Sequence, residues 1–236
     1  MIINNIYTVF LKRLFDIICS LVALILLSPL LAVVALLVKI KLGSPVIFKQ
    51  DRPGLNEKIF TLYKFRSMVA ATDKEGKMLT DKQRLTALTN EESNNKVSSD
   101  QDRLTPFGRQ IRALSLDELP ELVNILKGNM SFVGPRPLST LYLPYYNEKE
   151  RLRHTVKPGL TGLAQVNGRN TIAWEERFTY DIEYVNHVSF KEDIYILLKT
   201  VAVVFRRDDI AQAEQKPIAF HLVRQQEWNE VSSKKV

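Results

Sequence analysis

The sequence predicts an α+β protein with an apolar segment near its N-terminus, and three patterns lead to this prediction. A run of 22 uncharged residues, Ile17–Val38, is interrupted only by a few small or polar side chains and one proline. Two later segments repeat apolar residues at the spacing of one helix face. Short apolar runs bounded by proline and glycine are typical of β-strands. We therefore expect a membrane-inserted helical segment followed by a small, mainly helical domain with short strands.

The apolar run has the length of a membrane helix and a break near its middle. A bilayer core about 30 Å thick needs roughly 20 apolar residues of helix. Ser28-Pro29 lies near the midpoint, and proline kinks a helix because it lacks the amide hydrogen and clashes with the preceding turn. Each half is only about 14–16 Å long. The run is therefore compatible with a re-entrant helix–break–helix and with an ordinary kinked transmembrane helix.

Positive charge flanks this run on both sides. Lys12 and Arg13 precede it, and residues 39–66 after it include seven basic and two acidic side chains, a local net charge of +5. Basic flanks are typical of the cytoplasmic side of a membrane and of contact with anionic headgroups. The whole chain has a net charge of +7, which favours anionic partners: a membrane surface, nucleic acid or phosphorylated substrates.

The composition also excludes several classes of protein. Hydrophobic residues make up 45% of the chain, which is enough for a core and excludes a wholly disordered protein. Cys19 is the single cysteine, so the chain has no internal disulfide. The three histidines lie 33 and 34 residues apart, which excludes local zinc-ligand spacing. The sequence contains no Walker loop and no dinucleotide-binding glycine motif.

Short strands are predicted at Val46–Gln50 and Ile59–Arg66, joined by a turn around Pro53-Gly54, and a further strand at Phe132-Val133. Two amphipathic helices are predicted later in the chain. Ser115 and Glu118 form an S-x-x-E capping box for the first. The second helix is compatible with lying in the membrane interface and with packing on the core. The apolar stripes consist of Leu119, Leu122, Val123 and Leu126 in the first helix, and Ile194, Leu197, Leu198, Val201, Val204 and Phe205 in the second.

Asp117 and Glu118 are the first candidates for catalysis. Consecutive residues on a helix do not face each other, so the pair supplies one carboxylate aimed at a site and a second with an adjacent role. Both are expected in a first helical turn, where the helix dipole stabilises anions. Taken alone, they would be interpreted as ordinary acidic residues at a helix N-terminus.

Five cations in strand, helix or turn positions strengthen the functional interpretation. Arg136 is held between two prolines after a glycine, and Arg169 follows the turn Asn167-Gly168. A guanidinium recognises phosphate through paired hydrogen bonds, so arginines presented rigidly suggest a phosphate ligand. With the acidic pair and the apolar run, they predict phosphate chemistry at a lipid surface. The five cations are Lys64, Arg66, Arg112, Arg136 and Arg169.

Several blocks carry a resemblance to a known family. They are, in order, Lys12-Arg13-Leu14-Phe15-Asp16, Ser28-Pro29, Gln50-x-Arg52-x-Gly54, Lys64-Phe65-Arg66-Ser67-Met68, Ser115-Leu116-Asp117-Glu118-Leu119-Pro120, Asn129-Met130-Ser131-Phe132-Val133-Gly134-Pro135-Arg136-Pro137 and Lys157-Pro158-Gly159-Leu160-Thr161-Gly162. Over residues 11–207 the chain resembles the bacterial sugar transferases, in particular the monotopic phosphoglycosyl transferases that act on polyprenol phosphate. Its compact length is similar to that of the minimal members.

The resemblance implies a two-step reaction. Asp117 would attack the sugar-linked phosphate of a UDP-sugar, UMP would leave, and undecaprenyl phosphate would take the phosphosugar from the aspartyl intermediate. Family knowledge places Mg²⁺ at Asp117, leaves Glu118 to support the metal or act as base, and makes Ser28-Pro29 the turn of a re-entrant hairpin. An N-acetylated hexosamine is the sugar that the resemblance favours.

The resemblance also implies the organisation and location of the chain. We expect a membrane-inserted segment at residues 1–42, a catalytic domain at 43–210 with a polar mobile insertion at 80–101, and a C-terminal tail at 211–236 that is loosely ordered past Lys216. The protein is expected at the bacterial inner membrane with its catalytic domain on the cytoplasmic face, as the first membrane step of glycan assembly. Its expected partners are membrane lipids and both substrates, with downstream glycosyltransferases as further candidates, and no nucleic acid.

Two departures and two alternatives accompany this prediction. Glu57 stands where the family often has a second glycine, and Leu163 replaces a more usual tryptophan, so contacts with sugar or lipid would differ.

The first alternative function is that of a single-step glycosyltransferase, which would release UDP instead of UMP. A non-catalytic basic scaffold on anionic membrane, binding nucleic acid with a steep salt dependence, is compatible with composition but gives the acidic pair no role.

Overall fold

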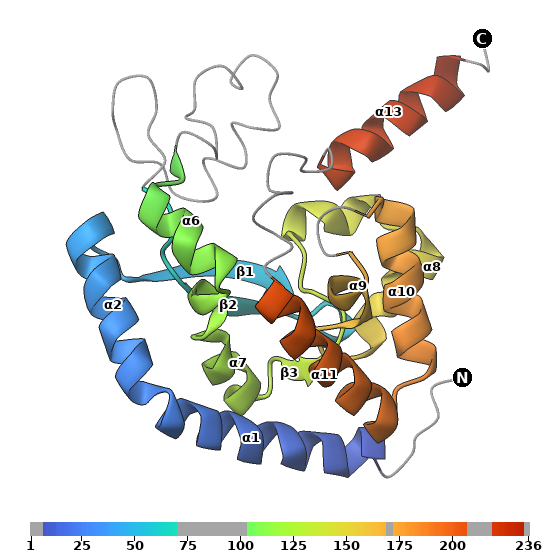
Figure 1. The fold of residues 1–236 in the computed structure, drawn as a ribbon. Helices are drawn as coiled ribbons and strands as arrows, with labels where there is room; N and C mark the ends of the chain where they lie inside the picture. Colours follow the sequence, from blue (N-terminus) through green and yellow to red (C-terminus); the bar gives the residue numbers. More distant parts are fainter. Residues whose placement is uncertain (1–6, 70–102, 169–171, 207–218, 234–236) are drawn as a thin grey trace. The chain divides into compact units, whose positions relative to one another are not determined.

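The computed structural model of the chain describes residues 7–69, 103–168, 172–206 and 219–233. The structure combines many helices with a few short strands (Figure 1), which is compatible with the predicted α+β class. The chain folds into two compact units. The first unit contains Met1–Ile25, Asp51–Leu62 and Glu121–Val236, and the second contains Leu26–Gln50 and Tyr63–Pro120. The insertion predicted at residues 80–101 lies outside the described residues.

The apolar run forms two helices, α1 (Lys12–Leu26) and α2 (Ser28–Leu42), after the short η1 (Tyr7–Leu11). The break predicted at Ser28-Pro29 lies at Leu27, directly before these two residues, and Pro29 occupies the first turn of α2, where a missing amide hydrogen costs nothing. Within the described residues, neither helix by itself has the length and apolarity needed to cross a bilayer; together α1 and α2, bent by 64° at their break, meet that requirement.

The second unit has a core built on one side of α2. Val34 and Val38 of this helix pack with Phe65 and Ile111. Phe65 belongs to strand β2 (Ile59–Phe65), which pairs with β1 (Ile47–Pro53), while Ile111 belongs to helix α6 (Pro106–Ala113). The predicted strands and their turn are thus confirmed to within a few residues. The apolar residues on the rest of α2 are exposed, namely Leu30, Val33, Leu36, Leu37 and Ile40.

The first unit contains a short parallel sheet. Strand β3 (Ser131–Val133) pairs with β4 (Gly159–Thr161), with Ser131 opposite Gly159 and Val133 opposite Thr161. This confirms the strand predicted at Phe132-Val133. The crossover between the two strands carries η4 (Thr140–Tyr145), α8 (Glu148–Arg151) and η5 (Leu152–Thr155).

Two long helices and a short one cover this sheet (Figure 1): α9 (Leu163–Val166), α10 (Trp174–Asn186) and α11 (Phe190–Arg206). Val133, Leu163, Tyr184 and Ile196 form the buried core between them. The departure at Leu163 is therefore a core substitution, since this side chain is only 7% exposed.

The predicted apolar faces of two helices need correction. In α7 (Glu121–Lys127), Leu122 is buried as expected, but the other buried side chains are Ile125 and the polar Glu121 and Asn124, outside the predicted stripe. Asn124 lies inward because its amide donates to the Thr61 carbonyl (2.8 Å). In α11 the fully buried apolar residue is Ile196, while Leu198 and Val201 of the predicted stripe are exposed. The structure therefore shows that α11 packs on the core through Ile196, and its position in a membrane interface stays a prediction.

An aromatic cluster contradicts the expectation of a loosely ordered tail past Lys216. Helix α13 (Phe220–Ser233) follows that residue, and Phe220 is 1% exposed. Its ring lies 5.0 Å from Phe178 and 5.5 Å from Trp174, measured between centroids. The polar composition of the segment conceals this anchor, because a single aromatic side chain is enough to dock the first turn of a helix. Arg224, one turn later, forms an ion pair with Glu150.

Replacing Phe220 with alanine is expected to destabilise the protein by about 3–5 kcal/mol, because it removes a fully buried ring and leaves a cavity. Leu222→Ala on the same helix is the matched control, since Leu222 is 40% exposed. Denaturation of the purified protein measures both. Equal losses from the two variants would show that Phe220 does not anchor α13.

Candidate active site

The acidic pair lies in a tight turn, η3 (Leu116–Glu118), which follows α6 in the second unit. Ser115 before it adopts the left-handed conformation (φ 54°, ψ 20°), and its side chain makes no capping hydrogen bond. The predicted capping box is therefore wrong: the Ser115 amide closes a turn on the Arg112 carbonyl (2.9 Å) instead of starting an α-helix. Left-handed residues other than glycine cost about 1–3 kcal/mol and cluster at functional sites.

Glu118 is held by a cation from the sheet. The Lys64 ammonium lies 2.7 Å from Glu118 Oε1, and the two side chains are only 18% and 17% exposed. An ion pair shielded to this degree is stronger than a surface pair, because fewer water dipoles screen it. Lys64, predicted to bind phosphate, thus fixes the second carboxylate of the pair. Asp117 beside it is 8% exposed.

Arg66, the other cation predicted on this strand, contacts the end of α2. Its guanidinium donates to the carbonyl oxygens of Leu42 and Ser44, the latter at 2.8 Å. The Leu42 carbonyl belongs to the last residue of α2, and a cation stabilises the C-terminus of a helix. Arg66 therefore joins the end of β2 to the end of the apolar helix, a contact that the predicted role in phosphate binding did not include.

Arg112 and Gly108 attach α6 to the segment after β2. The Arg112 Nε donates to Ser67 Oγ at 2.7 Å. A Cβ atom at Gly108 would lie 2.8 Å from the Ser67 carbonyl carbon and closer still to its oxygen, so only glycine permits this approach. The residues of the second unit predicted for the site are thus linked through one short stretch, Lys64–Ser67.

The described residues of this site offer few side-chain ligands to a metal ion. Within the described residues, no group of three or more histidine, cysteine, aspartate or glutamate side chains is placed to hold one. Mg²⁺, however, commonly binds one or two carboxylates and takes its other ligands from water and substrate phosphates. The consecutive carboxylates Asp117 and Glu118 fit that smaller requirement in the presence of a phosphorylated ligand.

Arg136 belongs to the first unit and follows β3 through Gly134-Pro135. Gly134 makes room for the neighbouring chain, since a Cβ there would be 2.9 Å from the Gly159 amide nitrogen. The Arg136 carbonyl accepts a hydrogen bond from Arg153 at 2.7 Å. Its side chain is partly exposed. Arg169, predicted as a further phosphate ligand, lies outside the described residues.

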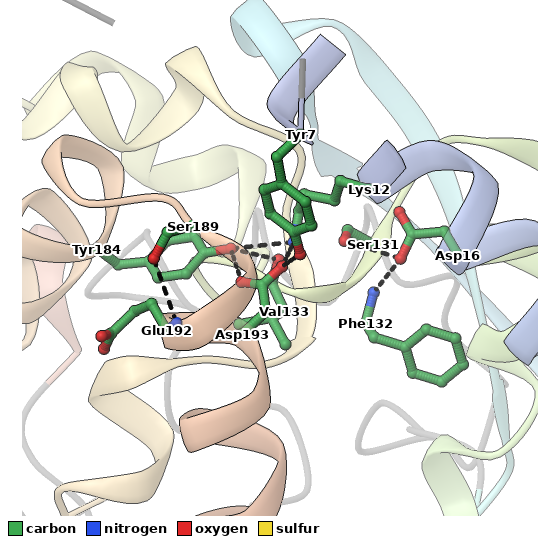
Figure 2. A network of polar contacts seen from close by, with 10 residues as sticks. All are labelled: Tyr7, Lys12, Asp16, Ser131, Phe132, Val133, Tyr184, Ser189, Glu192 and Asp193. Atoms are coloured by element: carbon green, nitrogen blue, oxygen red, sulfur yellow. Dashed lines mark hydrogen bonds and ion pairs between the residues drawn. The ribbon is translucent and has the colours of Figure 1, made fainter. Parts of the chain in front are cut away.

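A polar network with several buried side chains holds β3 in place (Figure 2). Asp16 of α1 accepts hydrogen bonds from the Phe132 amide and the Ser131 hydroxyl, both at 3.0 Å. The Tyr184 hydroxyl lies 3.1 Å from the Val133 carbonyl and 2.7 Å from Asp193. Burial, followed by the Asp193 charge, raises the pKa of Tyr184 well above its usual value, so this hydroxyl stays protonated.

The start of α1 supplies the cations of this region. Lys12 forms an ion pair with Asp193, which also accepts a hydrogen bond from the Tyr7 hydroxyl (Figure 2). Arg13 donates to the Ile125 and Leu126 carbonyls (2.7 and 2.8 Å) and so caps the C-terminus of α7.

Sequence reasoning assigned Lys12 and Arg13 to the basic flank of the apolar run, and it gave none of the network residues a role in holding β3. Lys12 and Asp16 were detectable as an i, i+4 pair of opposite charge on one helix face. Tyr184 and Asp193 gave no signal, because their partners near the start of the chain lie more than 170 residues away in sequence.

Glu57, which stands where the resemblance predicts a glycine, has a backbone conformation typical of glycine. It ends the short η2 (Leu55–Glu57) with φ 61°, a left-handed conformation that favours glycine. Its carboxylate lies 2.5 Å from Arg151, and this ion pair helps to hold a conformation that a non-glycine side chain rarely adopts. The glycine that the resemblance leads us to expect at this position would suit its left-handed backbone.

The arrangement suits nucleophilic chemistry at an electrophile that carries negative charge. A buried carboxylate lies beside a second one neutralised by Lys64, and Arg112 lies at the C-terminal end of the preceding helix. An aspartate with a reference pKa of about 3.9 needs no base to become a nucleophile at neutral pH. Cations are what such a nucleophile requires when its target is a phosphate.

Comparison with known proteins identifies the family of the chain. A family model described as bacterial sugar transferase matches residues 7–207. The chain is 48% identical over 202 residues to the uncharacterized sugar transferase EpsL of Bacillus subtilis, covering 86% of this chain and 91% of that protein. It is 44% identical over 200 residues to the undecaprenyl-phosphate galactose phosphotransferase of Salmonella typhimurium, covering 84% of this chain but only 41% of that protein.

The name of a third relative states both a sugar donor and a lipid acceptor. The UDP-glucose:undecaprenyl-phosphate glucose-1-phosphate transferase of Klebsiella pneumoniae is 40% identical over 207 residues, covering 84% of this chain and 41% of its own length. The match to the family model extends over most of the chain and includes the acidic pair, Lys64 and Arg136. The chain therefore belongs to the bacterial sugar transferase family.

Proposed function

We propose that this enzyme transfers a phosphosugar from a UDP-sugar to undecaprenyl phosphate and releases UMP, as the first membrane step of bacterial glycan assembly. The observation that carries the proposal is the buried Asp117 in a strained turn, beside a Glu118 that Lys64 neutralises. The names of the Salmonella and Klebsiella relatives support the choice of lipid acceptor, and the Klebsiella name supports the choice of donor.

The proposed reaction has two displacements at one aspartate. A carboxylate oxygen of Asp117 attacks the phosphorus bonded to the sugar, the bond from this phosphorus to the bridging oxygen breaks, and UMP leaves with that oxygen. The phosphate oxygen of the lipid then attacks the same phosphorus and frees Asp117, giving a polyprenol diphosphate sugar. Dividing the transfer in this way replaces one difficult step with two easier ones.

The cations of the site address the main obstacle, which is repulsion between a carboxylate and a diphosphate. We assign Arg112, Arg136 and Arg169 to binding the substrate phosphates, as the sequence predicted. Lys64 and Arg66 act mainly by holding the turn and the end of α2, given their contacts. When bound at Asp117, Mg²⁺ would neutralise diphosphate charge and stabilise the leaving group. Glu118 supports that ion or accepts a proton in the second step.

The location proposed for the enzyme is the bacterial inner membrane, with the catalytic part on the cytoplasmic face and α1–α2 as a re-entrant hairpin. The exposed apolar side chains of α1, which include Ile18, Val22, Ile25 and Leu26, support insertion into lipid. The basic residues on both flanks support a single cytoplasmic side. A site at headgroup depth would admit both a lipid phosphate and a soluble nucleotide.

A labelling experiment tests the hairpin. In a Cys19→Ser background, single cysteines placed at Asn4 and at Asn56 are both expected to react with a membrane-impermeant maleimide only after the cytoplasmic side is opened. This result follows because a re-entrant segment returns the chain to the side on which it entered. Labelling of the Asn4 position from outside intact cells would show that the segment spans the bilayer.

The released nucleotide tests the reaction itself. Purified protein in membrane discs, given undecaprenyl phosphate, Mg²⁺ and a panel of UDP-sugars that includes glucose, galactose and N-acetylated hexosamines, is expected to release UMP with one of them. Release of UDP would instead identify a single-step glycosyltransferase. Release of neither nucleotide with any donor, together with salt-sensitive binding to nucleic acid, would favour the non-catalytic scaffold.

A further inference from the structure

Arg153 makes a direct contact with the backbone of a residue in the proposed site. Its Nη2 donates to the Arg136 carbonyl at 2.7 Å. The same guanidinium donates through Nε and Nη2 to Asp181 Oδ2, at 2.9 and 2.7 Å. Both side chains of this ion pair are only 2% exposed. Arg153 on η5 and Asp181 on α10 therefore form a buried ion pair that contacts the backbone of Arg136.

A buried ion pair of this kind is poor evidence for stability. Removing two charges from water costs several kcal/mol per ion, and apolar replacements of similar size are often as stable. The Arg153 guanidinium also lies over the Tyr146 and Phe178 rings (5.9 and 5.8 Å from Cζ to centroid), so its surroundings are largely aromatic. Stability alone therefore does not explain why the chain buries this ion pair. Its hydrogen bond to the Arg136 carbonyl points to a role in positioning Arg136.

The rest of the segment that leads to Arg136 is fixed just as completely. The Ser131 amide donates to the Pro158 carbonyl (2.9 Å), and the Gly134 amide to the Thr161 carbonyl (2.9 Å). The Pro135 carbonyl accepts from the Gly159 amide at 3.0 Å. Prolines on both sides of Arg136 restrict its backbone further. The hydrogen bond from Arg153 adds a contact to the Arg136 carbonyl itself.

Three guanidiniums lie in the surroundings of Asp181. Asp181 contributes one negative charge, while Arg153, Arg177 and Arg136 contribute three positive charges nearby. Burial lowers the pKa of Arg177, the Asp181 charge opposes this, and the charges of Arg136 and Arg153 lower it further. Arg177 lies over the Trp174 ring at 4.4 Å.

We infer that Arg153, held by Asp181, is a positioning residue that sets the orientation of Arg136 toward the diphosphate of the donor. The inference rests on the proposed function, because that function identifies the anion. Arg153 is itself buried and bonded on both sides, so it acts through Arg136 and does not contact the donor.

The primary variant is Arg153→Met, which keeps an apolar stem among the aromatic rings and removes every donor. Binding of UDP, a probe that carries the diphosphate but no sugar to transfer, is measured by calorimetry on the full chain in membrane discs. The variant is expected to bind UDP on the order of tenfold more weakly. In an Arg136→Ala background, the same change should cause no further loss. Arg153→Lys, whose ammonium still reaches Asp181 and the carbonyl, should restore most of the affinity.

Arg151→Met is the matched control. Arg151 also binds one carboxylate, Glu57, and one backbone carbonyl, but that carbonyl belongs to Leu143 (2.8 Å) instead of Arg136. This variant should bind UDP within about twofold of the parent, since partly exposed ion pairs contribute little. If Arg153→Met fails to fold, Arg153→Met/Asp181→Asn removes both buried charges and provides the folded alternative.

Hydrogen exchange gives a readout that is independent of the donor. The amides of Arg136 and Leu138 should exchange faster in Arg153→Met than in the parent, and should not change in Arg151→Met. Unchanged exchange at these amides would overturn the inference. So would an equal loss of UDP affinity with and without the Arg136 side chain. A parent protein that does not bind UDP, but whose exchange responds to Arg153→Met, would contradict the proposed donor and leave the positioning role supported.

Discussion

Asp117→Asn is expected to abolish both UMP release and the covalent phosphosugar adduct. The amide has nearly the volume of the carboxylate, so the η3 turn and the Lys64–Glu118 ion pair should persist. It lacks the ionised oxygen that forms the bond to phosphorus, and loss of a nucleophile lowers turnover by at least about a thousandfold. Intact-mass measurement under saturating UDP-sugar, before the lipid is added, should show the adduct in the parent and none in the variant.

Asp51→Asn is the control for loss of a carboxylate. Asp51 is exposed on β1 and contacts the Thr61 hydroxyl (3.1 Å), so this variant should retain turnover and form the adduct. Turnover that persists in Asp117→Asn would remove this residue from the nucleophilic role. Product that accumulates in the parent without any adduct would remove the covalent step from the mechanism.

Local sequence signals were reliable where the backbone is controlled by proline or glycine. The break between α1 and α2 lies within one residue of Ser28-Pro29, and the turn at Pro53-Gly54 separates β1 from β2. In both places the residue type itself restricts φ or supplies conformational freedom. No distant contact is needed to specify such a feature, so it can be predicted from the sequence.

Features that depend on distant partners were missed or misplaced. The apolar stripe predicted for α7 omitted Glu121 and Asn124, which are buried; Asn124 has its amide partner on β2, and hydrophobic periodicity cannot encode that contact. The S-x-x-E pattern at Ser115 was misleading for a related reason. Ser115 has a left-handed backbone, and its amide donates to the Arg112 carbonyl in a turn. The S-x-x-E pattern is also typical of an ordinary helix start, so it does not reveal this turn.

The same distinction applies to the candidate site. The acidic pair was recognised from its neighbours in sequence, and the cations from their residue type and from the strand, helix or turn on which they were predicted to lie. Lys64, Arg66 and Arg112 each turn out to have a protein partner, namely Glu118, the end of α2 and Ser67. A basic side chain does not reveal in the sequence whether it holds the protein or the ligand, because both roles require the same charge and donors.

Gly108→Ala is expected to destabilise the protein by at least about 2 kcal/mol, against the direction of helix propensity. Alanine normally stabilises a helix by about 1 kcal/mol relative to glycine. Here the added methyl group would meet the backbone carbonyl of Ser67, and a backbone group cannot rotate away as a side chain would. The amide of Gly108 also donates to the Thr105 hydroxyl (3.0 Å), which fixes the first turn of α6 in this position.

The effect on catalysis should exceed what the loss of stability predicts. Pushing α6 away from Ser67 strains the Arg112–Ser67 hydrogen bond and displaces the segment that begins at Lys64, which holds Glu118. A misplacement of about 1 Å at such a point lowers turnover by on the order of a hundredfold. Gln110→Ala places the same new residue on an exposed position of the same helix and should leave melting temperature and UMP release unchanged. If Gly108→Ala instead raised the melting temperature and kept full turnover, helix propensity would dominate, and the close contact between α6 and Ser67 would not be what holds the acidic turn in place.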